Sequence, residues 1–312
     1  LVFTIIFQTN ILFYKMELPI VNHPEYVAKI NENSVFPIKK FSSLANYLLQ
    51  NNIVKKFYVP KECSIETLSK SHSIDYINHI KNKTLDKKSE TKIGFPINNS
   101  VVKRSFLATG GTVLASKLAL EYKLACNTAG GSHHASYDFG AGYCVFNDVA
   151  VAANYLKYKK KIKNILILDL DVHQGNGNSD IFKNDKDIFT FSMHCKSNYP
   201  AKKSKSDMDI ELEDELEDKE YLEILKKNIN YLNKINFDFV FYIAGVDVHH
   251  DDKLGKLKLT DHGINQRDKI VIENFFLKKT PLCGVLGGGY NKSFDKLIEL
   301  HALLHKNCAT FF

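Results

Sequence analysis

The chain has 312 residues, 44% of them hydrophobic, and neither a linker-like stretch nor an internal repeat divides it, which suits one large α/β domain. Its formal net charge is +7, but the lysines are not interleaved with aromatic residues, so we interpret them as solvated surface and expect no nucleic-acid binding. Six scattered cysteines without a C-x-x-C pair exclude a disulfide framework and favour reduced thiols in a cytoplasmic protein.

The first segment of the chain, residues 1–15, is apolar but interrupted by Gln8-Thr9-Asn10. It lacks the basic region and the cleavage site of a signal peptide, and it is too short to span a bilayer, so we expect no membrane span. Met16 resembles a more natural start. We therefore expect residues 1–15 to be an extension upstream of a single domain over 16–312, the alternative being an extra ordered strand.

Alternating helices and strands are predicted along the rest of the chain. Apolar residues recur at helical spacing in segments 41–55, 65–81, 104–124 and 218–235. Short apolar runs predict strands at 56–59, 125–129, 165–170, 188–192, 239–246 and 282–287. The alternation indicates βαβ units and a parallel sheet.

Two segments stand out from this pattern. Gly110-Gly111 interrupts the third helix, which predicts either close packing or a break there. The acidic stretch 207–220 is expected to be a solvated loop that leads into a helix, the alternative being a cation site.

Ionisable side chains follow two of the predicted strands directly. Asp169, Asp171 and His173 end the strand at 165–170, and Asp247 ends the next apolar run. Because residues two apart on a strand share a face, Asp171 and His173 are expected to point into one cleft. Such groups are costly to bury unless something compensates their charge, and a metal ion is the simplest compensation.

Two more strand ends carry reactive groups. The adjacent imidazoles His133 and His134 follow Gly130-Gly131, and Tyr290 follows a glycine run. Carboxyl ends of parallel strands meet at one edge of the sheet, so these groups should converge with the metal ligands. Alone, an Asp-x-His pair or a tyrosine after glycines is more often structural, but the convergence favours catalysis.

These motifs, in this order, resemble those of the histone deacetylase superfamily, most closely its class IV branch and bacterial relatives. The resemblance spans roughly residues 16–305 and rests on segments 110–112, 129–134, 142–148, 169–177, 191–194, 244–247 and 286–290. It implies the arginase/deacetylase fold, a single domain with a mostly parallel sheet flanked by helices and an active site at the carboxyl ends of the strands.

The resemblance also implies which ions the protein binds and which residues bind them. Asp171, His173 and Asp247 match the family's metal ligands, which leave open positions for water and a substrate carbonyl. Zn²⁺ suits this set, and Fe²⁺ or Co²⁺ are alternatives. An interior monovalent-cation site, expected to hold K⁺, is implied at Asp169, Asp171, His173, Ser192 and Met193.

The catalytic roles implied are those of an amidohydrolase. His133 and His134 match tandem histidines that transfer protons, the second being the principal general base and acid. Tyr290 matches a tyrosine that donates a hydrogen bond to the oxyanion, and Asp169 is placed to orient His133. These groups imply hydrolysis of an N-acyl-lysine-like amide to an amine and a carboxylate.

A substrate tunnel is implied as well. Gly142 and Tyr143 match one wall, and Tyr199 is the expected opposite wall, so that the acyl-lysine stem would run between two rings. His249 and His250 are expected to be loop residues near the tunnel mouth. Acetyl-lysine in proteins, longer acyl-lysines, acetylated polyamines and other small acetylamines all fit the motifs, although the chain shows no long insertion of the kind typical of polyamine-specific relatives.

Asn176 departs from the pattern, because many relatives have an Asp that supports the second histidine. An amide cannot stabilise an imidazolium by charge, so we expect His134 to be less basic than in Asp-bearing relatives. The related ureohydrolases need two further acids, where this chain has Gly175 and His249, so a binuclear site is not expected. A silent scaffold is disfavoured because every catalytic group is present.

Overall fold

The computed structural model describes residues 17–312, so the expected extension at 1–15 and its alternative, an extra strand, lie outside the described residues. The core is one seven-stranded sheet of order β1-β2-β7-β6-β3-β4-β5, and every neighbouring pair of strands is parallel. The strands are β1 (Ile20–Val21), β2 (Leu124–Asn127), β3 (Ile165–Asp169), β4 (Ile188–Cys195), β5 (Met208–Leu212), β6 (Phe239–Ile243) and β7 (Leu282–Val285). The predicted α/β fold with a parallel sheet is confirmed.

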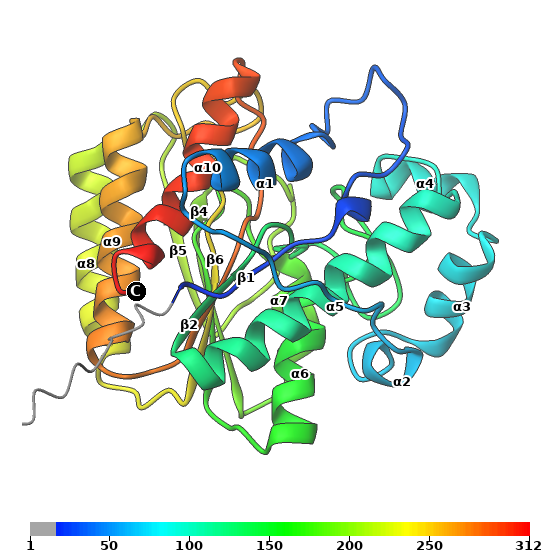
Figure 1. Cartoon of the computed structure of the whole chain (residues 1–312), viewed down its shortest axis with the longest axis horizontal. Helices are drawn as coiled ribbons and strands as arrows, with labels where there is room; N and C mark the ends of the chain where they lie inside the picture. Colours follow the sequence, from blue (N-terminus) through cyan, green and yellow to red (C-terminus); the bar gives the residue numbers. More distant parts are fainter. Residues whose placement is uncertain (1–16) are drawn as a thin grey trace, which may run out of the picture.

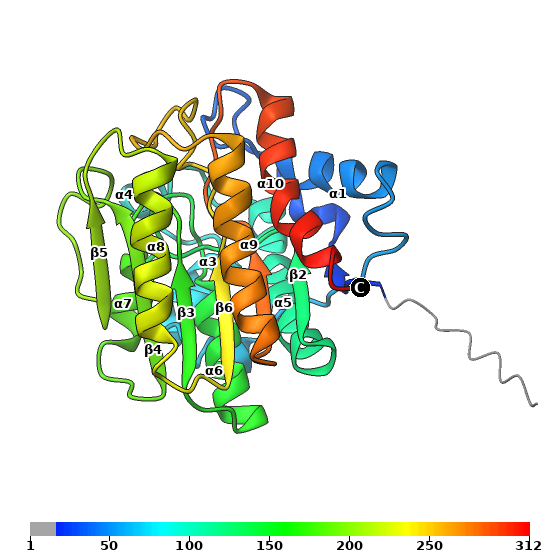
Figure 2. The ribbon, with the colours of Figure 1, turned by 90° about the vertical axis from the view of Figure 1, so that its left-hand side faces the viewer.

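Helices cover both faces of this sheet. They are the 3-10 turn η1 (Pro24–Tyr26), α1 (Lys40–Gln50), α2 (Ile65–Leu68), α3 (Ile74–Asn82), α4 (Lys87–Ile93), α5 (Asn99–Tyr122), α6 (Asp148–Lys160), α7 (Asn176–Phe182), α8 (Asp218–Leu232), α9 (Asp261–Leu277) and α10 (Phe294–Ala309). α8 and α9 lie on one face, and α5 and α6 lie on the other (Figure 1). Figure 2 shows α8 and α9 in front of the strands and β5 at the edge of the sheet. Within residues 17–312, no helix has the length and apolar character needed to cross a membrane.

The central strands form where the sequence is apolar on both faces. Every residue of β3 and of β6 is buried, as expected for parallel strands covered by helices on both sides. The two strands pair from Ile165↔Phe239 to Asp169↔Ile243 and therefore end at the same level. The loops that follow them, which carry the predicted metal ligands, consequently start side by side.

Three predicted segments differ from the observed structure. Segment 56–59 is not a strand, because only Tyr58 bridges to Val21. β5, by contrast, lies within the stretch expected to be a solvated loop. As an edge strand paired only with β4, it needs few apolar residues, and most of its residues are partly exposed. The helix expected over 65–81 is divided into α2 and α3 by a turn.

Gly110 and Gly111 lie within α5, which continues through them without a break. A Cβ at Gly110 would lie 2.0 Å from the backbone oxygen of Lys61, and one at Gly111 would lie 1.9 Å from Oη of Tyr26. The glycines therefore allow close packing, the first of the two alternatives that the sequence left open.

Candidate active site

Three buried ligand groups converge just beyond the ends of β3 and β6. Nδ1 of His173 lies 3.1 Å from Oδ1 of Asp171 and 3.1 Å from Oδ2 of Asp247, and the ligand atoms of all three lie within 4.8 Å of one another. Burial and the neighbouring Asp171 carboxylate raise the pKa of Asp247 to about 7. Two crowded, buried carboxylates and an imidazole form a donor set that a divalent cation fits, because the ion would relieve their repulsion.

Backbone amides and glycines hold this set in place. The N–H of Val172 donates to Oδ1 of Asp247 (3.0 Å), and the N–H of Gly288 donates to Oδ2 of Asp171 (2.6 Å). A Cβ at Gly288 would lie 2.0 Å from Oδ2 of Asp247. The glycine run before Tyr290 is therefore required for the close approach of backbone to carboxylates.

The tandem histidines lie beside the ligands, and each is oriented by a different partner. Nδ1 of His133 lies 2.7 Å from Oδ2 of Asp169, while Nδ1 of His134 lies 2.7 Å from Oδ1 of Asn176. Because the amide oxygen can only accept, His134 Nδ1 is the donor, and its Nε2 remains available to accept a proton.

The two histidines differ in basicity. Burial by itself lowers the pKa of His133, but the carboxylates of Asp169 and Asp171 outweigh burial and raise that pKa to about 9. Burial, together with the charges of His133 and His173, lowers the pKa of His134 well below its ordinary value. The pair therefore combines a cationic imidazole with a neutral one, and the neutral one has the state that a general base needs.

A cavity of about 290 Å³ leads to these groups. Gly142, Tyr143 and Tyr199 line it, and the ring of Tyr199 is 43% exposed and lies edge-on to His134 with centroids 4.8 Å apart. Tyr290 also lines the cavity, and its ring centroid lies 5.9 Å from that of Tyr143. Burial and the Asp247 and Asp171 carboxylates raise the pKa of Tyr290 well above its ordinary value, so its phenol remains a hydrogen-bond donor.

The sequence and the fold both match known proteins. A family model described as histone deacetylase domain matches residues 34–303. The chain is 30% identical over 276 residues to histone deacetylase 2 of Arabidopsis thaliana, covering 84% of this chain and 71% of that protein. The chain belongs to the histone deacetylase family. Membership in the family makes it a hydrolase acting on amides with an acylated substrate, and it indicates a divalent metal.

Two further proteins are similar to this chain over most of their length. An uncharacterized protein of Picosynechococcus sp. is 42% identical over 294 residues, covering 93% of this chain and 98% of that protein. The crystal structure of a histone deacetylase homologue from Aquifex aeolicus superposes with a TM-score of 0.81 at 24% identity, covering 95% of this chain and 84% of that one. This structural likeness confirms the arginase/deacetylase fold.

The register of β3 and β4 places Asp169 opposite Ser192 behind the metal ligands. Oδ1 of Asp169 accepts the N–H of Asp171 (3.2 Å), and both Ser192 and Met193 are buried. The K⁺ site expected from these residues together with His173 stays a prediction.

Two buried cations that the sequence interpretation missed line the same cavity. Lys40 is 1% exposed and donates to the backbone oxygen of Gly287 (3.3 Å); burial lowers its pKa to about 8. Arg104 is 8% exposed, and its guanidinium lies 4.7 Å from the ring centroid of Phe41. Lys40 could have been found from helical spacing, because it shares the buried face of α1 with Leu44.

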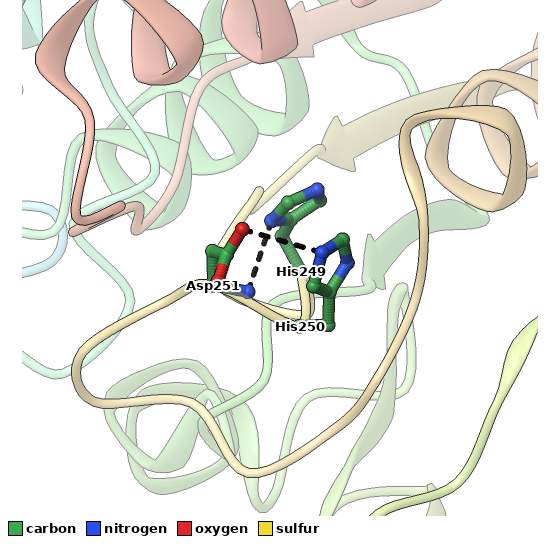
Figure 3. A group of neighbouring side chains, drawn as sticks. All are labelled: His249, His250 and Asp251. Atoms are coloured by element: carbon green, nitrogen blue, oxygen red, sulfur yellow. Dashed lines mark hydrogen bonds and ion pairs between the residues drawn. The ribbon is translucent and has the colours of Figure 1, made fainter.

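His249 and His250 are loop residues, as expected, but neither lines the cavity. With Asp251 they form a second group whose ligand atoms lie within 4.8 Å of one another (Figure 3). Nδ1 of His249 accepts the N–H of Asp251 (3.1 Å), and its Nε2–H donates to Asp261 (3.0 Å), so both of its ring nitrogens are used. Asp251 also pairs with Lys292 (3.3 Å). This group is therefore a hydrogen-bonded turn.

Proposed function

We propose that this protein is a metal-dependent amidohydrolase that removes an acetyl or longer acyl group from N-acyl-lysine. The observation that carries the proposal is that Asp171 and His173, two members of the three-ligand set, line one cavity together with His134 and Tyr290, with Asp247 buried directly behind them. These side chains follow four separate strands. Packing alone gives no reason for buried carboxylates, imidazoles and a phenol to meet at one place.

The proposed reaction assigns one task to each side chain. A Zn²⁺ ion, or alternatively Fe²⁺ or Co²⁺, held by Asp171, His173 and Asp247 would polarise the amide carbonyl and lower the pKa of water from ~15.7 toward ~7. His134 accepts the proton of the attacking water at Nε2 and returns it to the leaving amine. Tyr290 donates its phenol proton in a hydrogen bond to the oxygen on which negative charge develops.

His133 has a different part in the proposed reaction. The Asp169 carboxylate beside it raises its pKa, so it is the more basic of the two histidines and would supply a positive charge beside the reacting groups. Asp169 holds its ring in place through the 2.7 Å contact at Nδ1. Class IV members often have an Asn at the position of Asn176, the partner of the neighbouring His134, and this supports placing the chain in the class IV branch.

The cavity lining favours acyl-lysine over acetylated polyamines. Among the described residues that line it, Asp171 supplies the only carboxylate, and we assign that group to the metal; the exposed Lys92 adds a positive charge. A polyamine carries several positive charges and would meet no counter-charge there. The alternative substrate class is a small acetylamine, and a catalytically silent metal-binding or acyl-binding scaffold is the non-enzymatic alternative.

A substrate panel tests the proposal. Zinc-loaded, iron-loaded and cobalt-loaded protein would be assayed on lysine peptides from acetyl to long-chain acyl and on acetylated polyamines. His134→Ala and Tyr290→Phe would be assayed beside His262→Ala, which alters an exposed histidine. Turnover that the first two variants abolish and the third retains supports the mechanism, and the preferred acyl length defines the substrate. A metal-loaded protein without turnover on any of these substrates contradicts it.

A further inference from the structure

The guanidinium of Arg267, on α9, lies directly behind the loops that carry the metal ligands. The side chain is completely buried, and its Nη1–H donates to the backbone oxygens of Gly245 (2.5 Å) and Leu170 (3.3 Å). Leu170 immediately precedes Asp171, and Gly245 lies two residues before Asp247. One side chain therefore joins the two chain segments that bring the carboxylates of the metal site together.

The hydrogen bonds of Arg267 lie just beyond the end of the ladder between β3 and β6. The ladder between β3 and β6 ends at Asp169↔Ile243, and the carbonyls of Leu170 and Gly245 lie beyond it. Buried carbonyls need a donor, and Nη1 of the planar guanidinium serves both of them while Nε and Nη2 face Asp268. Arg267 thus continues the connection between the two strands past the last pair, at the level where the ligands begin.

The orientation of the guanidinium is itself fixed. Nε of Arg267 lies 3.0 Å and Nη2 lies 2.9 Å from Oδ1 of Asp268, the next residue on α9. Asp268 also accepts a hydrogen bond from the phenol of Tyr242 on β6 (2.5 Å). The unit Tyr242–Asp268–Arg267 therefore connects helix α9, strand β6 and the end of β3 through buried, charge-assisted hydrogen bonds.

We propose that Arg267, held by Asp268, is a positioning residue for the metal centre, setting the separation of Asp171 and Asp247. The inference rests on the proposed function only in taking those carboxylates, with His173, as ligands of a divalent metal. Arg267 touches neither substrate nor metal, and it acts through the backbone of the two ligand loops. Groups that orient metal ligands in this way commonly change metal affinity about 10- to 100-fold when they are altered.

The test measures metal binding directly. Arg267→Lys keeps the charge but loses the planar guanidinium, whose Nη1 reaches both carbonyls while Nε and Nη2 face Asp268. Tyr242→Phe removes one support of Asp268. Val271→Ala is the matched control, because it removes apolar packing from the same buried face of α9 and leaves the polar link intact. For each protein we would measure Co²⁺ affinity by competition with a chelator, the visible Co²⁺ spectrum, and the Tm without metal.

The expected result is a loss of Co²⁺ affinity of about 10- to 100-fold in Arg267→Lys, with a changed spectrum and a smaller change in Tyr242→Phe. Val271→Ala should lower the Tm and leave affinity and spectrum unchanged. Arg267→Lys with wild-type affinity and spectrum overturns the positioning role, as does an equal affinity loss in Val271→Ala. In both cases a wild-type protein that binds metal and hydrolyses acyl-lysine leaves the proposed function standing. A wild-type protein that binds no divalent metal overturns both the positioning role of Arg267 and the proposed function.

Discussion

His134 Nδ1 and Asn176 Oδ1 lie 2.7 Å apart, so an uncharged amide orients the second of the tandem histidines. The hydrogen bond selects the tautomer whose Nε2 is free to accept a proton, but it adds no negative charge to stabilise the protonated ring. Burial and the charges of His133 and His173 lower the pKa of His134 well below its ordinary value. A general base of this kind stays neutral, and therefore competent, into the acid range.

Asn176→Asp should raise the pKa of His134, because a carboxylate this close favours the imidazolium by roughly 1–3 pH units. Below that pKa the ring is protonated and cannot accept a proton, so the acid limb of kcat/KM should move to higher pH by a similar amount. A pH–rate profile of the zinc-loaded enzyme measures the shift. Asn82→Asp, at an exposed position of α3, is the control, and an acid limb that stays in place contradicts the assignment of His134 as the base.

Tyr290→Phe should lower kcat by about 10²–10³, the usual effect of removing one oxyanion donor. KM should change little, because the hydrogen bond strengthens mainly as charge develops on the carbonyl oxygen. Steady-state kinetics on the best acyl-lysine peptide separates the two constants. Tyr158→Phe, which alters a half-exposed ring on α6, should behave as wild type. A Tyr290→Phe enzyme with a near-normal kcat would remove the tyrosine from the mechanism.

Gly288→Ala should impair metal binding without unfolding the protein. The added Cβ would lie 2.0 Å from Oδ2 of Asp247 and 2.9 Å from Oδ2 of Asp171, so at least one carboxylate must move. Chelator competition measures the metal affinity, and circular dichroism monitors the fold. Gly284→Ala is a stringent control, because its Cβ would meet only side-chain atoms of Leu304 and Cys126, at 3.1 Å or more. Equal metal affinity in both variants would contradict the proposed ligand geometry.

Gly111→Ala should destabilise the fold even though alanine favours a helix by about 1 kcal/mol over glycine. A Cβ there would lie 1.9 Å from Oη of Tyr26, and overpacking of a core commonly costs about 1–3 kcal/mol. The free energy of unfolding, measured with denaturant, should fall by the overpacking cost less the helix gain, up to about 2 kcal/mol. Lys117→Ala, on the exposed side of α5, should change it by less than about 0.5 kcal/mol. A stabilised Gly111→Ala protein would show that Tyr26 can move aside.

Much of the fold and of the candidate site could be predicted from the sequence, because apolar runs and the groups that follow them lie together along the chain. Asp171 and Asp247 each come just after a fully buried strand, and parallel pairing alone is enough to bring those strand ends together. β5 could not be predicted in this way. An edge strand contacts the sheet along one side only, so its sequence carries little of the apolar pattern.

Buried charges were the other feature that a sequence interpretation missed. Lys40 and Arg267 are 1% and 0% exposed, although charged side chains are normally assigned to the surface. Helical spacing places each on the apolar face of its helix, Lys40 with Leu44 and Arg267 with Ile264. Arg267 has the carboxylate of the adjacent Asp268 as one partner. The backbone oxygens that also accept hydrogen bonds from Lys40 and Arg267 are distant in the sequence, and no local pattern reveals them.

β7, the last strand of the chain, lies in the middle of the sheet between β2 and β6. β1 and β2 therefore have no hydrogen-bonded connection to the strands β6-β3-β4-β5 until residues 282–285 pair with both β2 and β6. Tyr290 follows within a few residues of that strand. The segment of chain that completes the sheet is therefore also the one that brings Tyr290 to the reactive centre.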